Sequence, residues 1–295
     1  MLNPPVKPML LFNKSKPFDS SDYLFEIKWD GYRSIVFIKG TEILLQSRNG
    51  KDLTPYFPEL SDIYRNIKGS EVILDGEICY LNEQGKPEFK ALQGRLFKNY
   101  RCGEVSKAVN LIIWDILSCN KKDIYKSPLL ERKKILTDKV ISQDRLILAP
   151  YIEEQGIKLF NQAKSEQLEG IVAKLKTSPY VFKRSQYWYK IKVWQYVEVY
   201  IGGYSKERTG LLVGRYYKEK LQYMGKIKLA LPAEEEKALF QFLVTIKENS
   251  SPFQETKKQS AVYWVKPLVK CQVRYTELTH HQTFRHGYAV KLIFN

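Results

Sequence analysis

Charged side chains recur inside apolar stretches of this sequence, at a spacing that would put them on one face of a strand. Residues two apart on a strand point the same way, so YLFEIKW at 23–29 would place Glu26 and Lys28 together. The same spacing recurs in two later runs, at Asp75, Glu77, Trp188, Lys190 and Lys192. For any one pair, a solvated sheet face is the alternative. Buried charges, however, must be paired or must serve a ligand, so the repetition indicates a cleft lined by acids and bases.

A cleft of this composition suits a nucleotide. Lysines would surround a phosphate-sized space, carboxylates would hold a divalent metal, and aromatic rings would contact a base. A lysine crowded by other cations has a lowered pKa and can act as an amine nucleophile near neutral pH. We assign that role to Lys28, because Asp30 and Gly31 permit a tight turn that would bring the backbone close to a ligand.

The elements that must position these residues are mostly short strands. Apolar runs ended by Gly or polar residues predict strands, and they are YLFEIKW, SIVFIKG, EILLQSR, EVILDGEICYL and VNLIIWDIL. Helical patterns cover about 56–67, 128–142 and 156–168, and Ser127 with Pro128 would begin the second. This order predicts an α+β domain with a mostly antiparallel sheet.

The pattern changes after WYKIKVW at 188–194. Several short strands with turn residues between them, and one helix from Pro232 to about Ile246, predict a small barrel, and an OB-fold is the best candidate. We therefore expect two domains, at 1–194 and 195–295.

The chain carries 48 Lys and Arg against 32 Asp and Glu, a net charge of +16. Solubility alone is one explanation, but a polyanionic partner, either nucleic acid or an anionic membrane surface, is the sharper one. Aromatic residues, at 13%, favour nucleic acid because they can stack on bases. No segment approaches the roughly 18 to 20 apolar residues of a membrane span, and MLNPPVKPMLLFNKSKPF lacks the unbroken apolar stretch of a signal peptide. We expect a cytoplasmic protein.

Several other site classes lack support. The four cysteines, Cys79, Cys102, Cys119 and Cys271, are far apart, and the three histidines lie near the C-terminus, which argues against a zinc site and for reduced, buried thiols. The P-loop, the strand-linked G-x-G-x-x-G and the protein-kinase motifs are absent. A nucleotide-binding site in this chain would therefore have to be built from other motifs.

KWDGYR at 28–33 resembles the K-x-D-G-x-R signature of the covalent nucleotidyltransferases, which comprise ATP-dependent DNA ligases, RNA ligases and mRNA capping enzymes. Further segments resemble that superfamily's motifs in its order: SRNG at 47–50, LDGEI at 74–78, LIIWDIL at 111–117, EGIVAK at 169–174 and WYKIK at 188–192. SRNGKDLTPYFPEL, ALQGRL and EGIVAKL look most like the ligase module of bacterial end-joining DNA ligases and their small stand-alone relatives. The resemblance implies an ATP-dependent DNA ligase.

The resemblance also implies a role for each matching residue. Lys28 would attack the α-phosphate of ATP, giving lysyl-AMP and pyrophosphate; AMP would then pass to a 5′-phosphate and be displaced by a 3′-hydroxyl. The other roles would be Glu26 for adenine, Arg33 for the ribose and nick region, Arg48 for the 5′-phosphate, Glu77 for the ribose or the metal, Trp114 for stacking on adenine, Glu169 for a catalytic metal, and Lys174, Lys190 and Lys192 for the phosphates. Asp30 and Asp75 would have structural roles, and Trp29 and Tyr32 would pack.

The same resemblance implies ATP and Mg²⁺ (or Mn²⁺) as cofactors, nicked duplex DNA as partner, and a monomer that works in DNA repair or recombination. The family's second domain contacts DNA and carries a final R-x-D-K-type motif. Here Arg285 and Lys291 would replace that motif. The alternative is that both residues lie at a solvated edge of the barrel. Two alternatives remain: an RNA ligase of the superfamily, and a nucleic-acid-binding module without turnover. The set of Lys28, Glu169, Lys190 and Lys192 argues against the second.

Overall fold

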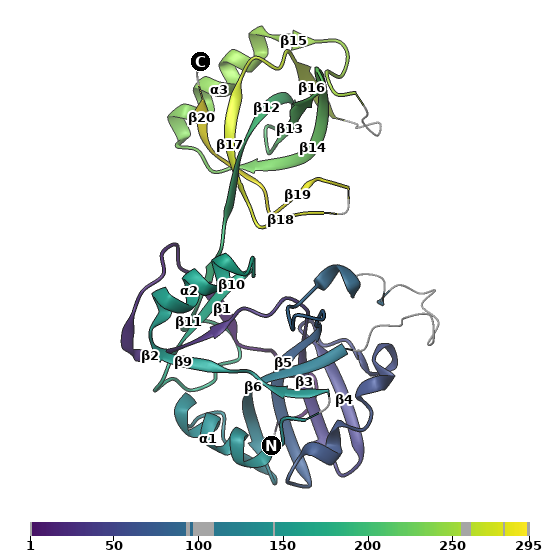
Figure 1. Cartoon of the computed structure of the whole chain (residues 1–295), viewed down its shortest axis with the longest axis vertical. Helices are drawn as coiled ribbons and strands as arrows, with labels where there is room; N and C mark the ends of the chain where they lie inside the picture. Colours follow the sequence, from purple (N-terminus) through teal and green to yellow (C-terminus); the bar gives the residue numbers. More distant parts are fainter. Residues whose placement is uncertain are drawn as a thin grey trace. The chain divides into compact units, whose positions relative to one another are not determined.

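The computed structural model describes residues 2–92, 95–96, 109–143, 145–254, 261–279 and 281–293. The chain divides into two compact units, Met1–Val193 and Trp194–Asn295 (Figure 1). In the ranges described, none of the helices has the length and apolar character needed to cross a membrane.

Two sheets build the first unit (Figure 1). One has the order β1 (Leu10–Asn13), β11 (Arg184–Lys192), β10 (Gly170–Leu175), β2 (Ser20–Ile27) and β9 (Tyr151–Glu154). The other has the order β4 (Glu42–Ser47), β3 (Tyr32–Lys39), β5 (Glu71–Tyr80), β6 (Val109–Cys119) and β7 (Lys122–Asp123), with β8 (Leu146–Leu148) also beside β6. Only the β1–β11 and β6–β8 pairs are parallel among the described strands of this unit. The predicted α+β domain with mostly antiparallel sheets is confirmed.

Apolar side chains from both sheets form one shared core. Leu24 on β2 and Trp188 on β11 belong to the same cluster as Ile35 on β3, Ile73 on β5 and Ile112 on β6. Helix α2 (Gly156–Ser165) packs on β10 and β2, and helix α1 (Leu129–Lys139) packs on β6. The part of the space between the sheets that these side chains fill is therefore dry, and polar groups that enter it need protein partners or a ligand.

The helix predicted over 56–67 is wrong. The segment forms three 3-10 turns, Thr54–Tyr56, Pro58–Leu60 and Ile63–Asn66. Pro55 and Pro58 have no N–H to donate, so they interrupt the ladder of bonds that a continuous helix needs.

The predicted start of α1 is also corrected. The helix begins at Leu129, Pro128 holds the N-cap position, and no side chain caps the first turn. The backbone carbonyl of Ser127 instead accepts a hydrogen bond from Arg132 Nη1 at 2.5 Å.

The second unit is a closed barrel of five strands (Figure 1). They pair in the order β12 (Gln195–Ser205), β13 (Leu211–Tyr217), β14 (Lys220–Leu229), β20 (Tyr288–Ile293) and β17 (Lys270–Tyr275), which returns to β12. The outer strands are β16 (Val262–Val265), β15 (Lys247–Glu248) and the hairpin of β18 (Glu277–Leu278) and β19 (Phe284–Arg285). Helix α3 (Ala233–Thr245) inserts Leu239, Phe240 and Leu243 into the barrel core. This arrangement is that of an OB-fold, as predicted.

Candidate active site

A cleft of about 510 Å³ opens in the first unit, within the size range of small-molecule sites. Its charged lining consists of Lys28, Arg33, Arg48, Lys51, Arg184, Lys190 and Glu77. Six cations therefore face one carboxylate, and such a lining favours a ligand that carries several negative charges.

Lys28 follows β2 directly, and its backbone fixes it beside Glu169. The Lys28 N–H donates to the carbonyl of Gly170 at 2.9 Å. Gly170 has a φ of +142°, and a Cβ there would lie 2.1 Å from the carbonyl oxygen of Ile191, so only glycine fits this crossing of strands. The Lys28 ammonium is hydrogen-bonded to Glu169 Oε2, and Lys192 Nζ lies 3.0 Å from Glu169 Oε1.

The expectation that neighbouring cations lower the pKa of Lys28 is wrong for the free protein. Burial favours the neutral amine, but the ion pair and hydrogen bond with Glu169 outweigh it, and the pKa of Lys28 is raised. Burial similarly opposes the charge on Glu169, yet Lys28 and Lys192 lower the pKa of that carboxyl. Lys28 is therefore held as an ammonium by Glu169 until a ligand changes its surroundings.

Lys190 shows the behaviour that was expected of Lys28. Burial lowers its pKa, and the neighbouring charges of Lys192, Lys28 and Arg184 lower it further. It lines the wide cleft together with Lys28. The nearby Glu169 offsets only part of this effect, so Lys190 is suited to bind a phosphate.

A smaller cavity of about 50 Å³ adjoins this region, and its lining includes Glu26, Trp29, Trp114, Lys174 and Trp188. Lys174 Nζ lies 2.6 Å from Glu26 Oε2 and 4.4 Å from the centre of the Trp188 ring. Burial, with the charge of nearby Lys133, lowers the pKa of Lys174 to about 8 despite Glu26. Lys174 thus lies with the residues predicted to recognise the base. Lys28 lines both the small cavity and the wide cleft, whereas Lys190 lines the wide cleft.

Asp75 connects several side chains at the back of the site. Arg33 donates from Nε and Nη2 to its two oxygens at 2.6 Å each, and Trp114 Nε1 and the Tyr180 hydroxyl lie 3.2 and 2.8 Å from Oδ2. The Arg33 guanidinium also lies 4.5 Å from the centre of the Trp114 ring. These contacts fit a structural role for Asp75, because one buried carboxylate fixes the orientation of both Arg33 and Trp114.

Arg48 and Glu77 lie in the wide cleft at different depths. Arg48 is exposed in the turn after β4, where Gly50 N–H donates to the Ser47 carbonyl at 2.9 Å. Glu77 is partly buried opposite Arg33 in the β3–β5 register. Burial raises the pKa of Glu77 to about 7, against the opposing effects of Arg33 and Lys28.

The Glu77→Gln substitution is expected to flatten the dependence of stability on pH. The pKa of Glu77 is about 7 in the folded protein and 4.5 in a free carboxyl. The folded state therefore binds more protons between these values, and the free energy of unfolding falls as pH rises through this range. The wild type should lose about 3 kcal/mol between pH 5 and pH 8 that the variant does not lose. Urea unfolding without ATP or metal measures this difference.

An exposed acid, Glu83, provides the matched control for that comparison. Glu83→Gln should follow the pH dependence of the wild type. An equal pH dependence in the wild type and Glu77→Gln would contradict the raised pKa.

The remaining residues of the first motif have packing roles. A Cβ on Gly31 would lie 2.2 Å from the carbonyl oxygen of Ile78. Any other residue at this position would therefore clash with the backbone of β5. Tyr32 packs against Phe57 and Phe89, at ring distances of 6.2 and 5.2 Å. Trp29 packs at the edge of the core between the sheets and also lines the small cavity.

Sequence reasoning missed two side chains of this site, Lys133 and Tyr180. Lys133 is buried and bonded to Glu26, and Tyr180 joins Asp75 to the backbone N–H of Met9 at 2.9 Å. A signal existed for Lys133, because Leu129, Lys133 and Leu136 recur at helical spacing on the buried face of α1. We find no comparable signal for Tyr180.

Two further sets of predicted residues remain. Arg285 and Lys291 belong to the second unit, and parts of ALQGRL and Cys102 fall outside the described residues. Arg285 on β19 forms an ion pair with Glu277 on β18, and Lys291 is exposed on β20. In ALQGRL at 91–96, Gln93 and Gly94 lie outside the described residues, as does Cys102. The other three cysteines are free and buried.

Across the described ranges, no group of three or more His, Cys, Asp and Glu side chains is arranged to hold a metal. The two predicted metal carboxylates, Glu77 and Glu169, are both partly buried in the first unit. Mg²⁺ commonly binds through one or two carboxylates together with the phosphates of a substrate. The raised pKa of Glu77 marks a carboxylate whose negative charge is incompletely offset, so the oxygen donors here fit such an ion.

Family models and known proteins match most of this chain. The model described as the ATP dependent DNA ligase domain matches residues 8–192, and that of the ATP dependent DNA ligase C terminal region matches residues 205–292. The SPbeta prophage-derived DNA ligase-like protein LigB of Bacillus subtilis is 34% identical over 211 residues, which are 70% of this chain and 75% of LigB. DNA ligase C of Mycobacterium tuberculosis is 30% identical over 80% of this chain and 69% of its own length.

Larger relatives match through one part of their length. The multifunctional non-homologous end joining protein LigD of Mycolicibacterium smegmatis is 28% identical over 89% of this chain, which spans 35% of that protein. Among solved structures, a mycobacterial DNA ligase D complexed with ATP and MES has a TM-score of 0.59 and 26% identity, with 98% of this chain and 95% of that chain covered.

Proposed function

This chain belongs to the ATP-dependent DNA ligase family, and from that premise we propose that it seals nicks bearing 5′-phosphate and 3′-hydroxyl ends through AMP bound to Lys28. The observation that carries the proposal is the placement of the Lys28 ammonium. It lies in a cleft with Arg48, Lys190 and Glu77 and is bonded to Glu169. An amine and a phosphate-binding lining are the two requirements for nucleotidyl transfer to a lysine.

In the first step, the neutral Lys28 amine attacks the α-phosphorus of ATP. A P–N bond forms, the bond from the α-phosphorus to the bridging oxygen breaks, and pyrophosphate leaves. Lys28 must first lose its ammonium proton, which Glu169 would accept because it is bonded to that ammonium. The attacking nitrogen loses a second proton to solvent as the P–N bond forms. Lys190 and Lys192 would hold the phosphates, whose charge they offset.

The adenine base of ATP would lie beside the small cavity. Glu26 would accept a hydrogen bond from the adenine amine, and Trp114 would stack on the ring. We reassign Lys174 from the phosphates to the base, because its ammonium is bonded to Glu26 and lies 5.1 Å from the centre of the Trp114 ring. Arg33 would contact the ribose from its fixed position on Asp75.

Glu77 and Glu169 would hold Mg²⁺, or Mn²⁺, when ATP is bound. The ion would neutralise negative charge on the reacting phosphate and on the leaving pyrophosphate.

The DNA would be bound by both domains, which we place at 1–194 and 195–295. Arg48 would hold the 5′-phosphate, because its exposed guanidinium can grip two phosphate oxygens at once. Arg285 and Lys291 of the second domain would supply the contacts of the family's final motif. The net charge of +16 supports binding to a polyanion, and we propose that the protein acts as a monomer. DNA repair in the cytoplasm is the setting we propose, with LigD as the precedent for end joining.

The test follows AMP through three products. The protein is first treated with pyrophosphate to remove bound AMP, and is then given α-labelled ATP and Mg²⁺. We expect labelled protein, then transfer of the label to a nicked DNA duplex, and then sealed DNA with released AMP. A nicked RNA duplex of the same sequence is the matched substrate and should stay open.

Each outcome has a distinct meaning. Labelled protein that seals RNA in place of DNA would contradict the substrate. Unlabelled protein that binds nicked DNA would contradict the proposed chemistry and favour a binding module.

A further inference from the structure

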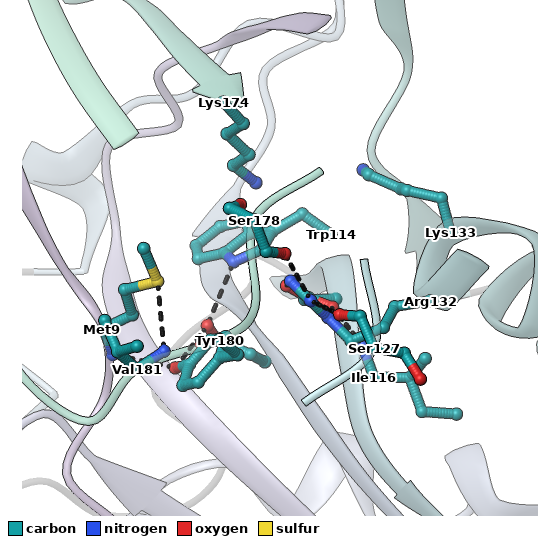
Figure 2. A network of polar contacts seen from close by, with 12 residues as sticks. Met9, Trp114, Ile116, Ser127, Arg132, Lys133, Lys174, Ser178, Tyr180 and Val181 are labelled. Carbon is teal, nitrogen blue, oxygen red and sulfur yellow. Dashed lines mark hydrogen bonds and ion pairs between the residues drawn. The ribbon is translucent and has the colours of Figure 1, made fainter. Parts of the chain in front are cut away.

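The Glu26 carboxylate is held from two sides by lysines on separate elements. Lys174 on β10 donates to Oε2 at 2.6 Å, and Lys133 on α1 donates to Oε1 at 2.5 Å. Figure 2 shows the side chains of Lys133 and Lys174 reaching toward one another, on the side of Trp114 away from Tyr180. Both oxygens of Glu26 are thus fixed by charged donors.

The two lysines differ in their access to a ligand. Glu26 and Lys174 line the small cavity, whereas Lys133 is absent from the lining that the described residues form. Lys133 instead reaches the carboxylate from α1, where its ammonium lies 5.0 Å from the centre of the Tyr151 ring. Lys133 therefore acts on a molecule in the cavity indirectly, through its hydrogen bond to Glu26 and through its charge near Lys174.

The charges of this group do not balance. The side chains of Glu26, Lys133 and Lys174 are only 2%, 4% and 3% exposed, and together they carry one negative and two positive charges. One lysine would suffice to compensate a buried carboxylate, and a second buried ammonium adds a desolvation penalty. An ion pair of Glu26 and Lys174 with a purely structural role would not need Lys133.

We propose that Lys133 is a positioning residue for nucleotide recognition: its hydrogen bond fixes the Glu26 carboxylate so that Glu26 and Lys174 present an acceptor and a donor side by side to the base. The Watson–Crick edge of adenine carries the complementary pair, an amine that donates and a ring nitrogen that accepts. This inference rests on the role proposed above for Glu26. Without Lys133, the carboxylate would be free to turn toward Lys174, and ordering it again would weaken ATP binding.

The test is the substitution Lys133→Met, with enzyme adenylation as the readout. Met has a similar length, and its introduction leaves Glu26 and Lys174 as a neutral pair, so the fold should persist. The KM for ATP should rise about tenfold, the size of one lost charge-assisted hydrogen bond. The maximal adenylation rate should stay within about threefold, because Lys133 does not touch the reacting phosphate.

Two variants control for effects other than positioning. Lys133→Arg keeps a charged donor and should restore most of the affinity for ATP. Lys134→Met changes the exposed neighbour on the same helix and should leave the KM for ATP unchanged. Thermal unfolding of each variant reports stability separately, and Lys133→Gln replaces Lys133→Met if the latter does not fold.

Glu26→Gln separates this inference from the proposed function. If Glu26→Gln leaves the KM for ATP unchanged, the proposed role of Glu26 is wrong. If Glu26→Gln raises the KM, Lys133→Met should add little in that background, because both changes remove the same contact. Full additivity, or a Lys133→Met protein that is less stable with an unchanged KM, would overturn the positioning role.

Discussion

The Lys28→Ala protein is expected to acquire no labelled AMP from ATP, whereas the wild type becomes labelled. Alanine has no amine with which to form the P–N bond. Lys190, the lysine of the wide cleft whose pKa is lowered, lies on β11, whereas Lys28 follows β2. The decrease should reach the detection limit of the assay, at least about 1,000-fold, since a nucleophile that forms a covalent bond has no substitute. Gel electrophoresis of the denatured protein after incubation with α-labelled ATP measures it.

Nicked DNA that already carries AMP on its 5′-phosphate provides the internal control. Its sealing needs no lysyl-AMP, so Lys28→Ala should still join it, which shows that the variant is folded. Lys16→Ala, an exposed lysine in the same unit, should be labelled like the wild type. Labelled Lys28→Ala protein would contradict the assignment of the nucleophile.

Much of the fold and the family could be predicted from the apolar pattern of the strands and from the order of the motifs. The β5 and β6 runs were found because they are nearly continuous apolar segments, and the barrel was found because its strands are short and separated by turn residues. The predicted ATP-dependent DNA ligase is confirmed by the family matches over 8–192 and 205–292. The roles of the individual site residues stay predictions.

Interactions between distant residues account for what the sequence did not reveal. The pKa of Lys28 depends on Glu169, 141 residues away, and their contact requires the pairing of β2 with β10. Local composition gave only the crowding by cations, and therefore the wrong direction for the shift. The resemblance implied that Lys174 binds the phosphates. Its bond to Glu26, which spans 148 residues and supports the role proposed for it above, could not be read from the sequence.

The Arg132→Leu substitution is expected to lower the free energy of unfolding by about 3 to 5 kcal/mol. Arg132 on α1 and Asp115 on β6 are fully buried, and two hydrogen bonds of 2.8 Å join them. Arg132 Nη1 also donates to the carbonyls of Ser127 and Ser178, at 2.5 and 2.9 Å (Figure 2). Leucine would leave the Asp115 carboxylate charged and uncompensated in the core. Urea unfolding at neutral pH measures the loss.

The double substitution Arg132→Leu with Asp115→Leu distinguishes charge from packing. Removing both charges ends the desolvation penalty, so most of the lost stability should return. A double variant as unstable as Arg132→Leu would show instead that the carbonyl contacts dock α1. Because Lys133 follows Arg132 on that helix, the KM for ATP of the double variant reports separately on the position of Lys133. A wild-type KM would mean that Lys133 keeps its position without the ion pair, so that the ion pair serves stability while Lys133 serves the nucleotide.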